Sequence, residues 1–452
     1  MSIRIASSNL NQIPLDWNRN LKNIKKSIEL AKKNKVEILC LPELSITGYG
    51  CQDLFYHQWF IKKSYKILDE IIEYTESITL IIGNPVIHKE KLYNGCCIIK
   101  DKKILGFFIK SNLPNDGIHY EKRWFESWEW GEIDEIKYNS KKYPIGNIQI
   151  EYSKDITLGF EICRDMWDEE RPANYIKTKK NLIIFNPLAS HYAFKKFDFR
   201  KKLVLESSEK YNCSYLSVNL LGNESGKVIF EGDTILASKG KLLSINNRFS
   251  FDKFSYSHYD IDFINQPNEI SYESPIIYEE FLDAFSLGLS DYLFKSKVKG
   301  FALSLSGGLD SSSIAILIYE MVKRILERKG TEIFNKELNL KIKFTDKIHL
   351  NVKKVIKEIL FTAYQETQNS SKETKESAKI LSDFIGSSHY EWSIDSEVKS
   401  ITDKISNETI KTYSWEEDDI TLQNVQARVR SPFIWFIANA NNLLLLSTSN
   451  RS

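Results

Sequence analysis

An apolar strand that runs directly into a glycine-containing loop and a helix is the feature that most constrains the fold of this chain. The segment is LSLSGGLDSSS, residues 303–313, in which Ser306, Gly307 and Gly308 precede Asp310. Glycine lets the backbone approach a ligand closely, and the amides at a helix N-terminus favour an anion. The segment therefore predicts a loop that holds a nucleotide's pyrophosphate at the carboxyl end of a strand in an α/β sheet.

This loop does not follow the other common pattern for phosphate binding. The spacing GxxxxGK[ST] is absent, and the segment supplies no lysine. Asp310 would instead hold Mg²⁺, which proteins bind with a carboxylate together with substrate phosphates. A tight turn without any ligand is the alternative interpretation of Ser-Gly-Gly after a strand.

Length and composition limit the classes of protein that need to be considered. The chain has 452 residues, more than one core usually organises, so two or three domains are expected. Lys and Arg number 62 against 60 Asp and Glu, which does not indicate a nucleic-acid partner. Signal-peptide and membrane-span patterns are absent, so we expect a cytosolic protein. The 6 cysteines lack CxxC spacing and the 7 histidines form no cluster, which argues against a zinc site and a disulfide framework.

A polar segment divides the chain into two patterns. Residues 1–262 alternate many short apolar strands with few helices, which predicts two packed sheets rather than a barrel. Residues 263–275 are mostly polar and contain Pro267 and Pro275, so they are the expected linker. Residues 276–452 alternate strand and helix, which predicts a doubly wound parallel sheet with ligands at the carboxyl ends of its strands.

The last residues of the chain are LLLLSTSNRS, an apolar segment followed by a short polar one. The apolar part would be a central strand of the second domain, and such a strand is normally covered on both faces. We therefore expect the second domain to be incomplete at its C-terminus.

Three segments of the first domain each place a reactive side chain at the end of a predicted strand. Glu43 lies in ILCLPELSITGYG, Lys110 in GFFIKSNLP and Cys163 in ITLGFEICRDMW. A thiolate attacks carbonyl carbon, but a free thiol needs a nearby base or cation to ionise at neutral pH. Glu43 would act as base and later as acid, and Lys110 would stabilise the oxyanion. Taken singly, the residues have plainer interpretations as a buried structural thiol and two surface charges.

The surrounding residues support the chemical interpretation. PELSITGYG, FFIKSNLPNDGIHYEKRWF and GFEICRDMW resemble the three catalytic segments of the nitrilase superfamily, in order and at similar separations. The resemblance implies an α-β-β-α sandwich in which Glu43, Lys110 and Cys163 are the catalytic triad and Glu121 is a second catalytic glutamate.

A fourth segment, NPLASHYAFKK, resembles the substrate-side loop of the same superfamily. The resemblance implies that Ser190 and Lys196 lie near the bound amide, which for a glutaminase member is that of glutamine. Asp116 departs from the pattern, because glutaminase members often carry an aromatic residue there, and its role in glutamine binding stays open.

Two segments of the second domain carry polar side chains near predicted strand ends. ETQNSSKETKESAK contains Ser370 and Ser371, either of which would cap the following helix or contact a ligand. LQNVQARVRSPFIWFIAN places Asn424, Arg428 and Arg430 on a helix, and arginine binds two phosphate oxygens at once. A surface salt bridge is the alternative role of these arginines.

The segments SGGLDSS, QNSSKET, NVQARVRS and STSNRS together resemble the synthetase domain of the NAD synthetase family, which belongs to the ATP pyrophosphatases. Behind a nitrilase-like domain, the resemblance is to the glutamine-dependent form. It implies Mg²⁺ on Asp310 and deamido-NAD on Asn424, Arg428 and Arg430. It implies ATP on Ser306, Gly307, Gly308, Leu309, Asp310, Ser311 and Thr448.

The resemblance implies a ligase that makes NAD⁺ from deamido-NAD, ATP and glutamine, as a homo-oligomer acting on small molecules. Two enzymatic alternatives remain open: an amidase whose C-terminal half only binds nucleotide, and another pyrophosphate-loop amidotransferase. A third alternative is a scaffold protein with inactive sites. The Lys-rich interval 321–357 resembles an insertion found in part of the family, and it has no functional interpretation.

Overall fold

The computed structural model of the chain describes residues 2–224, 226–265 and 268–448 and divides into two compact units, Met1–Gly288 and Leu289–Ser452. The division falls inside one helix, α4 (Ile277–Lys295), and not in the polar segment 263–275. Residues 277–288 therefore pack with the first unit, although the sequence pattern places them in the second domain.

The first unit is built on two sheets that face each other. The larger sheet has the strand order β16-β1-β2-β3-β4-β5-β7-β6, and the smaller has the order β15-β14-β11-β10-β9-β8. The strands of the larger sheet are β1 (Ser2–Leu10), β2 (Ile38–Cys40), β3 (Thr79–His88), β4 (Lys91–Lys100), β5 (Lys103–Ile109), β6 (Ile133–Tyr138), β7 (Lys141–Gly146) and β16 (Phe254–Asp262). The strands of the smaller sheet are β8 (Ile150–Glu151), β9 (Ile156–Phe160), β10 (Asn181–Leu188), β11 (Ser214–Asn219), β14 (Thr234–Ser238) and β15 (Lys241–Ile245).

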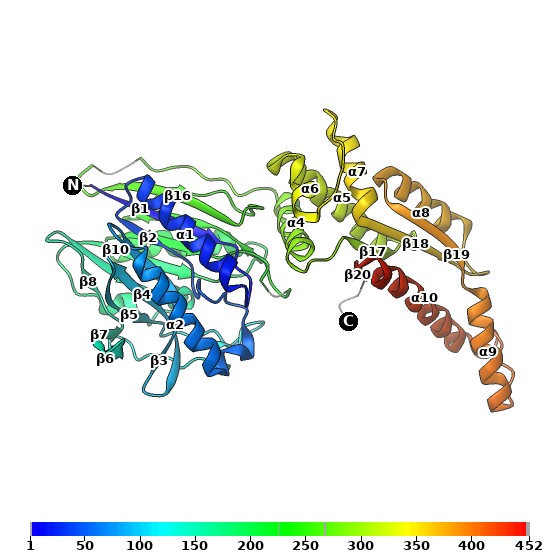
Figure 1. Cartoon of the computed structure of the whole chain (residues 1–452), viewed down its shortest axis with the longest axis horizontal. Coiled ribbons are helices and arrows are strands. Elements are labelled where there is room, and N and C mark those ends of the chain that lie inside the picture. Colours follow the sequence, from blue (N-terminus) through cyan, green and yellow to red (C-terminus); the bar gives the residue numbers. More distant parts are fainter. Residues whose placement is uncertain (1, 225, 266–267, 449–452) are drawn as a thin grey trace. The chain divides into compact units, whose positions relative to one another are not determined.

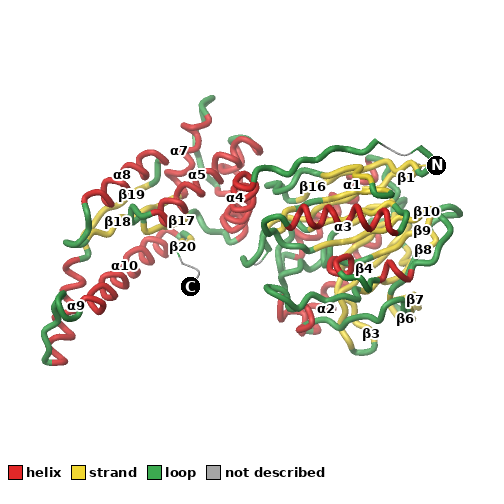
Figure 2. The backbone as a smooth tube through the Cα atoms, turned by 180° about the vertical axis from the view of Figure 1, so that it is seen from behind, coloured by secondary structure: helices red, strands yellow, loops and turns green. Residues whose placement is uncertain are grey.

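Helices cover the outer face of each sheet. α1 (Trp17–Lys33) and α2 (Gln58–Glu73) lie in front of the larger sheet in Figure 1, and α3 (Lys196–Lys210) covers the smaller sheet in Figure 2. The unit is thus an α-β-β-α sandwich, as the sequence predicted.

The alternation of side chains along each strand explains the layers. On β4, Cys96 and Ile98 belong to the core between the two sheets, whereas Cys97 and Ile99 belong to the core under α1 and α2. Successive side chains of a strand point to opposite faces, so a strand buried on both faces is apolar throughout. This is why YNGCCIIK lacks the apolar-polar alternation of a half-exposed strand.

One apolar segment of the first unit forms two strands. The segment KVIFEGDTILA forms β13 (Phe230–Glu231) and then β14, because Gly232 has φ +68° between them. Between residues 170 and 178 the chain forms one 3₁₀ turn, η4 (Pro172–Tyr175).

The second unit contains a fully parallel sheet of four strands with the order β19-β18-β17-β20. The strands are β17 (Phe301–Ser304), β18 (Leu360–Glu366), β19 (Ser388–Ser393) and β20 (Leu444–Leu446). In chain order the strands run 3-2-1-4, the doubly wound arrangement, so the order switches between β17 and β20. This confirms the predicted fold class of the second domain.

Helices lie on both faces of this sheet. α10 (Asp419–Asn441) packs Ile434 and Ala438 against Ala302 and Ala363. The opposite face carries α5 (Leu309–Lys329), α7 (Ile348–Ile359) and α8 (Lys372–Ile385), and Figure 1 shows the sheet between the two groups. Two further helices are α6 (Glu332–Leu338) and α9 (Asp395–Thr409). No helix of the described part of the chain is long and apolar enough to cross a membrane.

Candidate active site

The ends of three strands bring the predicted triad of the first unit together. Lys110 directly follows β5, and its Nζ lies 2.7 Å from Glu43 Oε1 and 2.8 Å from Glu121 Oε1. Cys163 begins η3 (Cys163–Trp167), three residues after β9 ends. Glu43, Lys110 and Glu121 are each at most 1% exposed. Residues separated by up to 78 positions in the sequence thus form one buried charged cluster.

Close backbone packing fixes the position of Glu43. A Cβ on Gly83 of β3 would lie 2.2 Å from Leu44 N, so only glycine lets the Glu43 loop pack on this strand. Asn94 of β4 donates from Nδ2 to Glu43 Oε1 at 2.7 Å. Glu43 Oε2 has no hydrogen-bond partner among the described residues. An unpartnered, buried carboxylate oxygen is costly for folding but is available to accept a proton.

Burial and charge act on the pKa values of this cluster in opposite directions. Burial raises the pKa of Glu43, and Lys110 offsets only part of that effect. Burial lowers the pKa of Lys110, but Glu121 and Glu43 raise it above its usual value. The lysine therefore keeps its charge without solvent, and Glu43 is a stronger base than an exposed glutamate.

The backbone at Cys163 aims the thiol into a cavity. Cys163 has φ +47°, and its N–H donates to Asn186 Oδ1 at 2.7 Å. The thiol accepts a hydrogen bond from the backbone of Ala189. Burial raises the pKa of Cys163 to about 12, although Lys110 lowers it. The resting group is thus a thiol, and its attack on a carbonyl requires a base.

Asp165 joins the cysteine turn to the lysine strand. One of its carboxylate oxygens accepts from the backbone N–H groups of Ser111 and Asn112, and the other from that of Ile162. Burial raises the pKa of Asp165 to about 7. The sequence pattern indicated no role for Asp165, although it lies only two residues after the predicted nucleophile.

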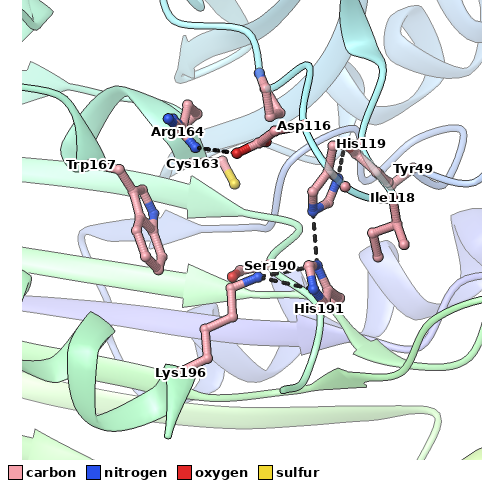
Figure 3. A pocket seen from close by; sticks show the side chains of 12 residues that line it. Tyr49, Asp116, Ile118, His119, Cys163, Arg164, Trp167, Ser190, His191 and Lys196 are labelled. Atoms are coloured by element: carbon pink, nitrogen blue, oxygen red, sulfur yellow. Dashed lines mark hydrogen bonds and ion pairs between the residues drawn. The ribbon is translucent and has the colours of Figure 1, made fainter. Parts of the chain in front are cut away.

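A cavity of about 410 Å³ opens above Cys163 (Figure 3). Asp116, Ser190 and Lys196, the three residues expected at the substrate, all line it. Asp116 Oδ2 lies 3.6 Å from Arg164 Nη1. The structure therefore places every residue of the predicted amide site at one cavity or in the cluster beneath it.

A buried arginine fixes the orientation of Ser190. Arg200 of α3 is fully buried, and its Nη1 donates to Ser190 Oγ at 3.1 Å. Glu231 and Asp233 balance the charge of Arg200. Because the serine oxygen accepts from Arg200, its single proton is free to be donated elsewhere.

The cavity also contains residues to which sequence analysis gave no role. Tyr49, His119 and His191 line it and are joined by hydrogen bonds. All three fall inside the segments PELSITGYG, GIHYEK and NPLASHYAF. The sequence could therefore have indicated these three residues, because each is a polar residue inside a segment that resembles a nitrilase segment.

The glycine loop of the second unit lies at the switch point of its sheet, after β17. Gly307 has φ +77°, and a Cβ there would lie 2.1 Å from Thr374 O. Ser311 Oγ accepts from Ser306 N at 3.2 Å, and Gly308 is the N-cap of α5. The loop is held by its own serines against the N-terminal part of α8.

A second cavity, of about 210 Å³, adjoins this loop. It is lined by Ser306, Gln365, Ser370 and Thr374 and by Arg430 of α10. Ser371 caps α8, since its side chain accepts from Thr374 N. The predicted cap is therefore confirmed at Ser371, and Ser370 lines the cavity.

Other residues predicted for this unit lie apart from the cavity or on the surface. Arg428 donates to Asn424 Oδ1 at 2.7 Å, and both side chains are exposed on α10. Leu309 and Asp310 are exposed at the start of α5, and Thr448 is exposed after β20. Arg430 alone of the two arginines lines the cavity, because a separation of two residues turns side chains to different sides of a helix.

The donor set near Asp310 suits Mg²⁺ only in the presence of phosphate. The described residues contain no group of three or more His, Cys, Asp or Glu side chains that could hold a metal ion. Mg²⁺ is usually bound by one or two carboxylates and by substrate phosphates, so a single carboxylate beside a phosphate loop fits this ion.

Comparisons with known proteins agree with the two units. The carbon-nitrogen hydrolase family model matches residues 4–261, and the NAD synthase model matches residues 281–452. The glutamine-dependent NAD(+) synthetase of Homo sapiens is 28% identical over 99% of this chain and 73% of its own length.

Solved structures give the same result. The crystal structure of a glutamine-dependent NAD(+) synthetase from Cytophaga hutchinsonii is 41% identical, with a TM-score of 0.91 over 100% of this chain and 75% of that one. The glutamine-dependent NAD+ synthetase from Acinetobacter baumannii in complex with ADP is 21% identical with a TM-score of 0.76, which shows a shared fold. With both family models matched in one chain and this identity along its whole length, the chain belongs to the glutamine-dependent NAD(+) synthetases.

Proposed function

We propose that the chain makes NAD⁺ from deamido-NAD, using ammonia that it releases from glutamine at Cys163. The observation that carries the proposal is the coexistence, in one chain, of a buried Glu43-Lys110-Cys163 cluster and a glycine loop at a sheet switch point. Glutamine hydrolysis is assigned to residues 1–262 and the synthetase to residues 276–452.

The first half-reaction begins with the thiol. Glu43 Oε2 takes the proton of Cys163 as the sulfur attacks the side-chain amide carbon of glutamine. Lys110 stabilises the resulting oxyanion, and Glu43 returns the proton to the nitrogen as the C–N bond breaks and ammonia leaves. Water then attacks the thioester, Glu43 takes its proton, and Cys163 regains a proton as glutamate departs.

Three cavity residues bind the amino-acid part of glutamine. Ser190 accepts a hydrogen bond from Arg200 and donates its own proton to the substrate. Lys196 supplies positive charge for the α-carboxylate, and Asp116 supplies negative charge for the α-ammonium group. Asp116 is paired with Arg164 at 3.6 Å, so glutamine has to compete for it.

The second half-reaction activates a carboxylate, because a carboxylate does not accept ammonia directly. An oxygen of the nicotinate carboxylate of deamido-NAD attacks the α-phosphorus of ATP, and diphosphate leaves. Ammonia displaces AMP and a proton is released. Ser306, Gly307, Gly308, Leu309 and Ser311 hold the phosphates of ATP, together with Thr448.

The residues that bind Mg²⁺ and deamido-NAD are assigned from the segments that resemble the NAD synthetase family. Asp310 would hold Mg²⁺, which supplies charge neutralisation for the leaving diphosphate. Asn424, Arg428 and Arg430 bind deamido-NAD, and Arg430 is the one that lines the cavity. A cytosolic homo-oligomer without a nucleic-acid partner completes the proposal, and light scattering after size exclusion tests its oligomeric state.

The proposed function is tested by measuring both products, glutamate and NAD⁺, that the purified chain forms. With glutamine, ATP, Mg²⁺ and deamido-NAD, glutamate and NAD⁺ are expected in equal amounts, and ammonium is expected to replace glutamine for NAD⁺ alone. Glutamate without NAD⁺ under both conditions would support the amidase alternative. An absence of both products would contradict the proposal.

A further inference from the structure

A row of polar side chains connects the cavity with the buried cluster. Lys196 Nζ lies 3.1 Å from Nδ1 and 3.4 Å from Nε2 of His191, and His191 Nδ1 lies 2.8 Å from His119 Nε2. His119 Nδ1 is 3.3 Å from the hydroxyl of Tyr49, which donates to Glu121 Oε1 at 2.6 Å. Figure 3 shows both histidines and Lys196 along one wall of the cavity.

Both imidazole rings in this row are neutral at physiological pH. Burial, with the charge of Lys196, lowers the pKa of His119 to about 4. Burial, with the charge of Lys196 and the neighbouring His119, lowers the pKa of His191 to about 3. A neutral imidazole has one nitrogen that donates and one that accepts, so each ring passes a hydrogen bond on in one direction.

The direction of the hydrogen bonds in this row follows from its inner end, where Tyr49 contacts Glu121. Tyr49 has a single proton, and the 2.6 Å contact with the Glu121 carboxylate is far shorter than the 3.3 Å contact with His119. The tyrosine oxygen can therefore only accept from His119, which places the proton of that ring on Nδ1. His119 Nε2 must then accept, so His191 carries its proton on Nδ1.

The donor and acceptor at the outer end of the row, between Lys196 and His191, can be assigned in the same way. Since Nδ1 of His191 is a donor, only Nε2 can accept from the ammonium group of Lys196, in spite of the shorter distance to Nδ1. Every hydrogen bond from Lys196 to Glu121 thus points inward. The lysine uses one proton on His191 and keeps two for the cavity.

We propose that His119 and His191 are positioning residues of the amide-hydrolysing site, which hold Lys196 as a donor toward the substrate carboxylate and tie it to Glu121. This inference rests on the proposed glutamine hydrolysis. The histidines do not touch the reacting atoms, so their removal is expected to weaken glutamine binding more than turnover.

The environment of Lys196 provides a pH readout. Burial lowers the pKa of Lys196 to about 8. The cation is therefore lost as the pH rises through 8, and the KM for glutamine should rise there. Removing the His191 ring admits water, so the pH at which the KM for glutamine rises should increase by about one unit. This rise is the alkaline limb of the pH profile. The ionisable groups that face Lys196 are Arg200 on its own helix, Asp116, Cys163, Glu231, His119 and His191.

The first experiment is independent of activity. Nitrogen-15 labelling of the 7 histidines in the full chain, with His119→Ala and His191→Ala for assignment, reports which ring nitrogen carries each proton. Protonated Nδ1 in both rings is expected. A protonated Nε2 in either ring at pH 7 would overturn the inference, whether or not the chain hydrolyses glutamine.

The second experiment measures glutamate release from pH 6 to pH 10. For His191→Ala we expect a KM for glutamine about 10-fold higher, with kcat changed less than about 3-fold and the alkaline limb moved upward. His191→Asn, which keeps a donor toward His119, should restore part of the loss, and His258→Asn on the edge strand β16 is the matched control. Circular dichroism verifies folding of each variant. An unchanged KM and limb in a folded His191→Ala, beside an active wild-type chain, would contradict the inference.

Discussion

The two candidate sites of this molecule are built in opposite ways. The cluster around Cys163 is buried and carries its own counter-charges, whereas Asp310 at the start of α5 and Thr448 after β20 are exposed. Amide hydrolysis needs a base and a cation whose pKa values differ from those in water, and burial produces that difference. A phosphate loop needs only free amides and space, since the ligand brings the charge. The first site can therefore be recognised without its substrate, and the second is completed by its ligand.

The largest expected effect separates the two sites. Cys163→Ala should lower glutamine-dependent glutamate release by at least about 10⁴-fold, because no other group can form the thioester. Ammonium-dependent NAD⁺ formation should stay within about 2-fold of wild type. Parallel assays of both products test this, and a loss of the ammonium reaction in a folded variant would show that the sites are not separable.

In the first unit, burial of the charged cluster makes the free energy of unfolding depend on Lys110. Lys110→Met leaves Glu43 and Glu121 buried without their cation, which should lower the free energy of unfolding by about 3–5 kcal/mol. Urea unfolding followed by circular dichroism measures the loss. The double variant with Glu121→Gln should recover part of it, and equal stabilities of the single and double variants would contradict the explanation.

Close packing constrains the glycine loop of the second unit. Gly307→Ala places a Cβ 2.1 Å from Thr374 O at a φ of +77°, so the loop has to move. We expect ammonium-dependent NAD⁺ formation to fall by about 10²-fold. Glutamate release in a glutaminase assay without ATP should be unchanged. Gly330→Ala, at a φ of +81° with no atom within 4 Å, controls for backbone strain alone.

The smallest effect concerns the helix beside that loop. Ser371→Ala removes the N-cap of α8 and should cost about 1 kcal/mol of unfolding free energy. Ser377→Ala, an exposed position inside the same helix, is the matched control and should stabilise the protein slightly, by about 0.5 kcal/mol, because alanine has the higher helix propensity. Thermal unfolding of both variants is the measurement, and equal losses would show that capping is not the cause.

Sequence reasoning identified the fold class where the pattern was strong. The alternation of strand and helix in the second unit predicted its doubly wound sheet, and the start of α8 was predicted from the capping residues Ser370 and Ser371. The Lys-rich interval 321–357 was not interpreted, although α7 buries Val352, Val355, Ile356 and Ile359 at helical spacing. The three lysines of α7, Lys353, Lys354 and Lys357, interrupt this apolar stripe in the sequence.

The candidate site was predictable only in part. Glu43, Lys110 and Cys163 were chosen from their segments, and the structure brings the two charged groups within 2.7 Å. Their mutual distance depends on strand order, which no local pattern contains. The roles of Asp165 and His191 depend on hydrogen bonds to residues far away in the sequence, so sequence spacing alone could not assign them.

The cysteines of this protein allow folded and unfolded molecules to be distinguished by thiol alkylation. All six are free thiols, and Cys163 is the most exposed at 8% and lines the cavity. The other five lie in the interior, beyond the reach of a water-soluble alkylating reagent. A folded chain should therefore consume about one equivalent of reagent and an unfolded chain six. Consumption above one equivalent, before the preparation is unfolded, would therefore measure its share of unfolded chains.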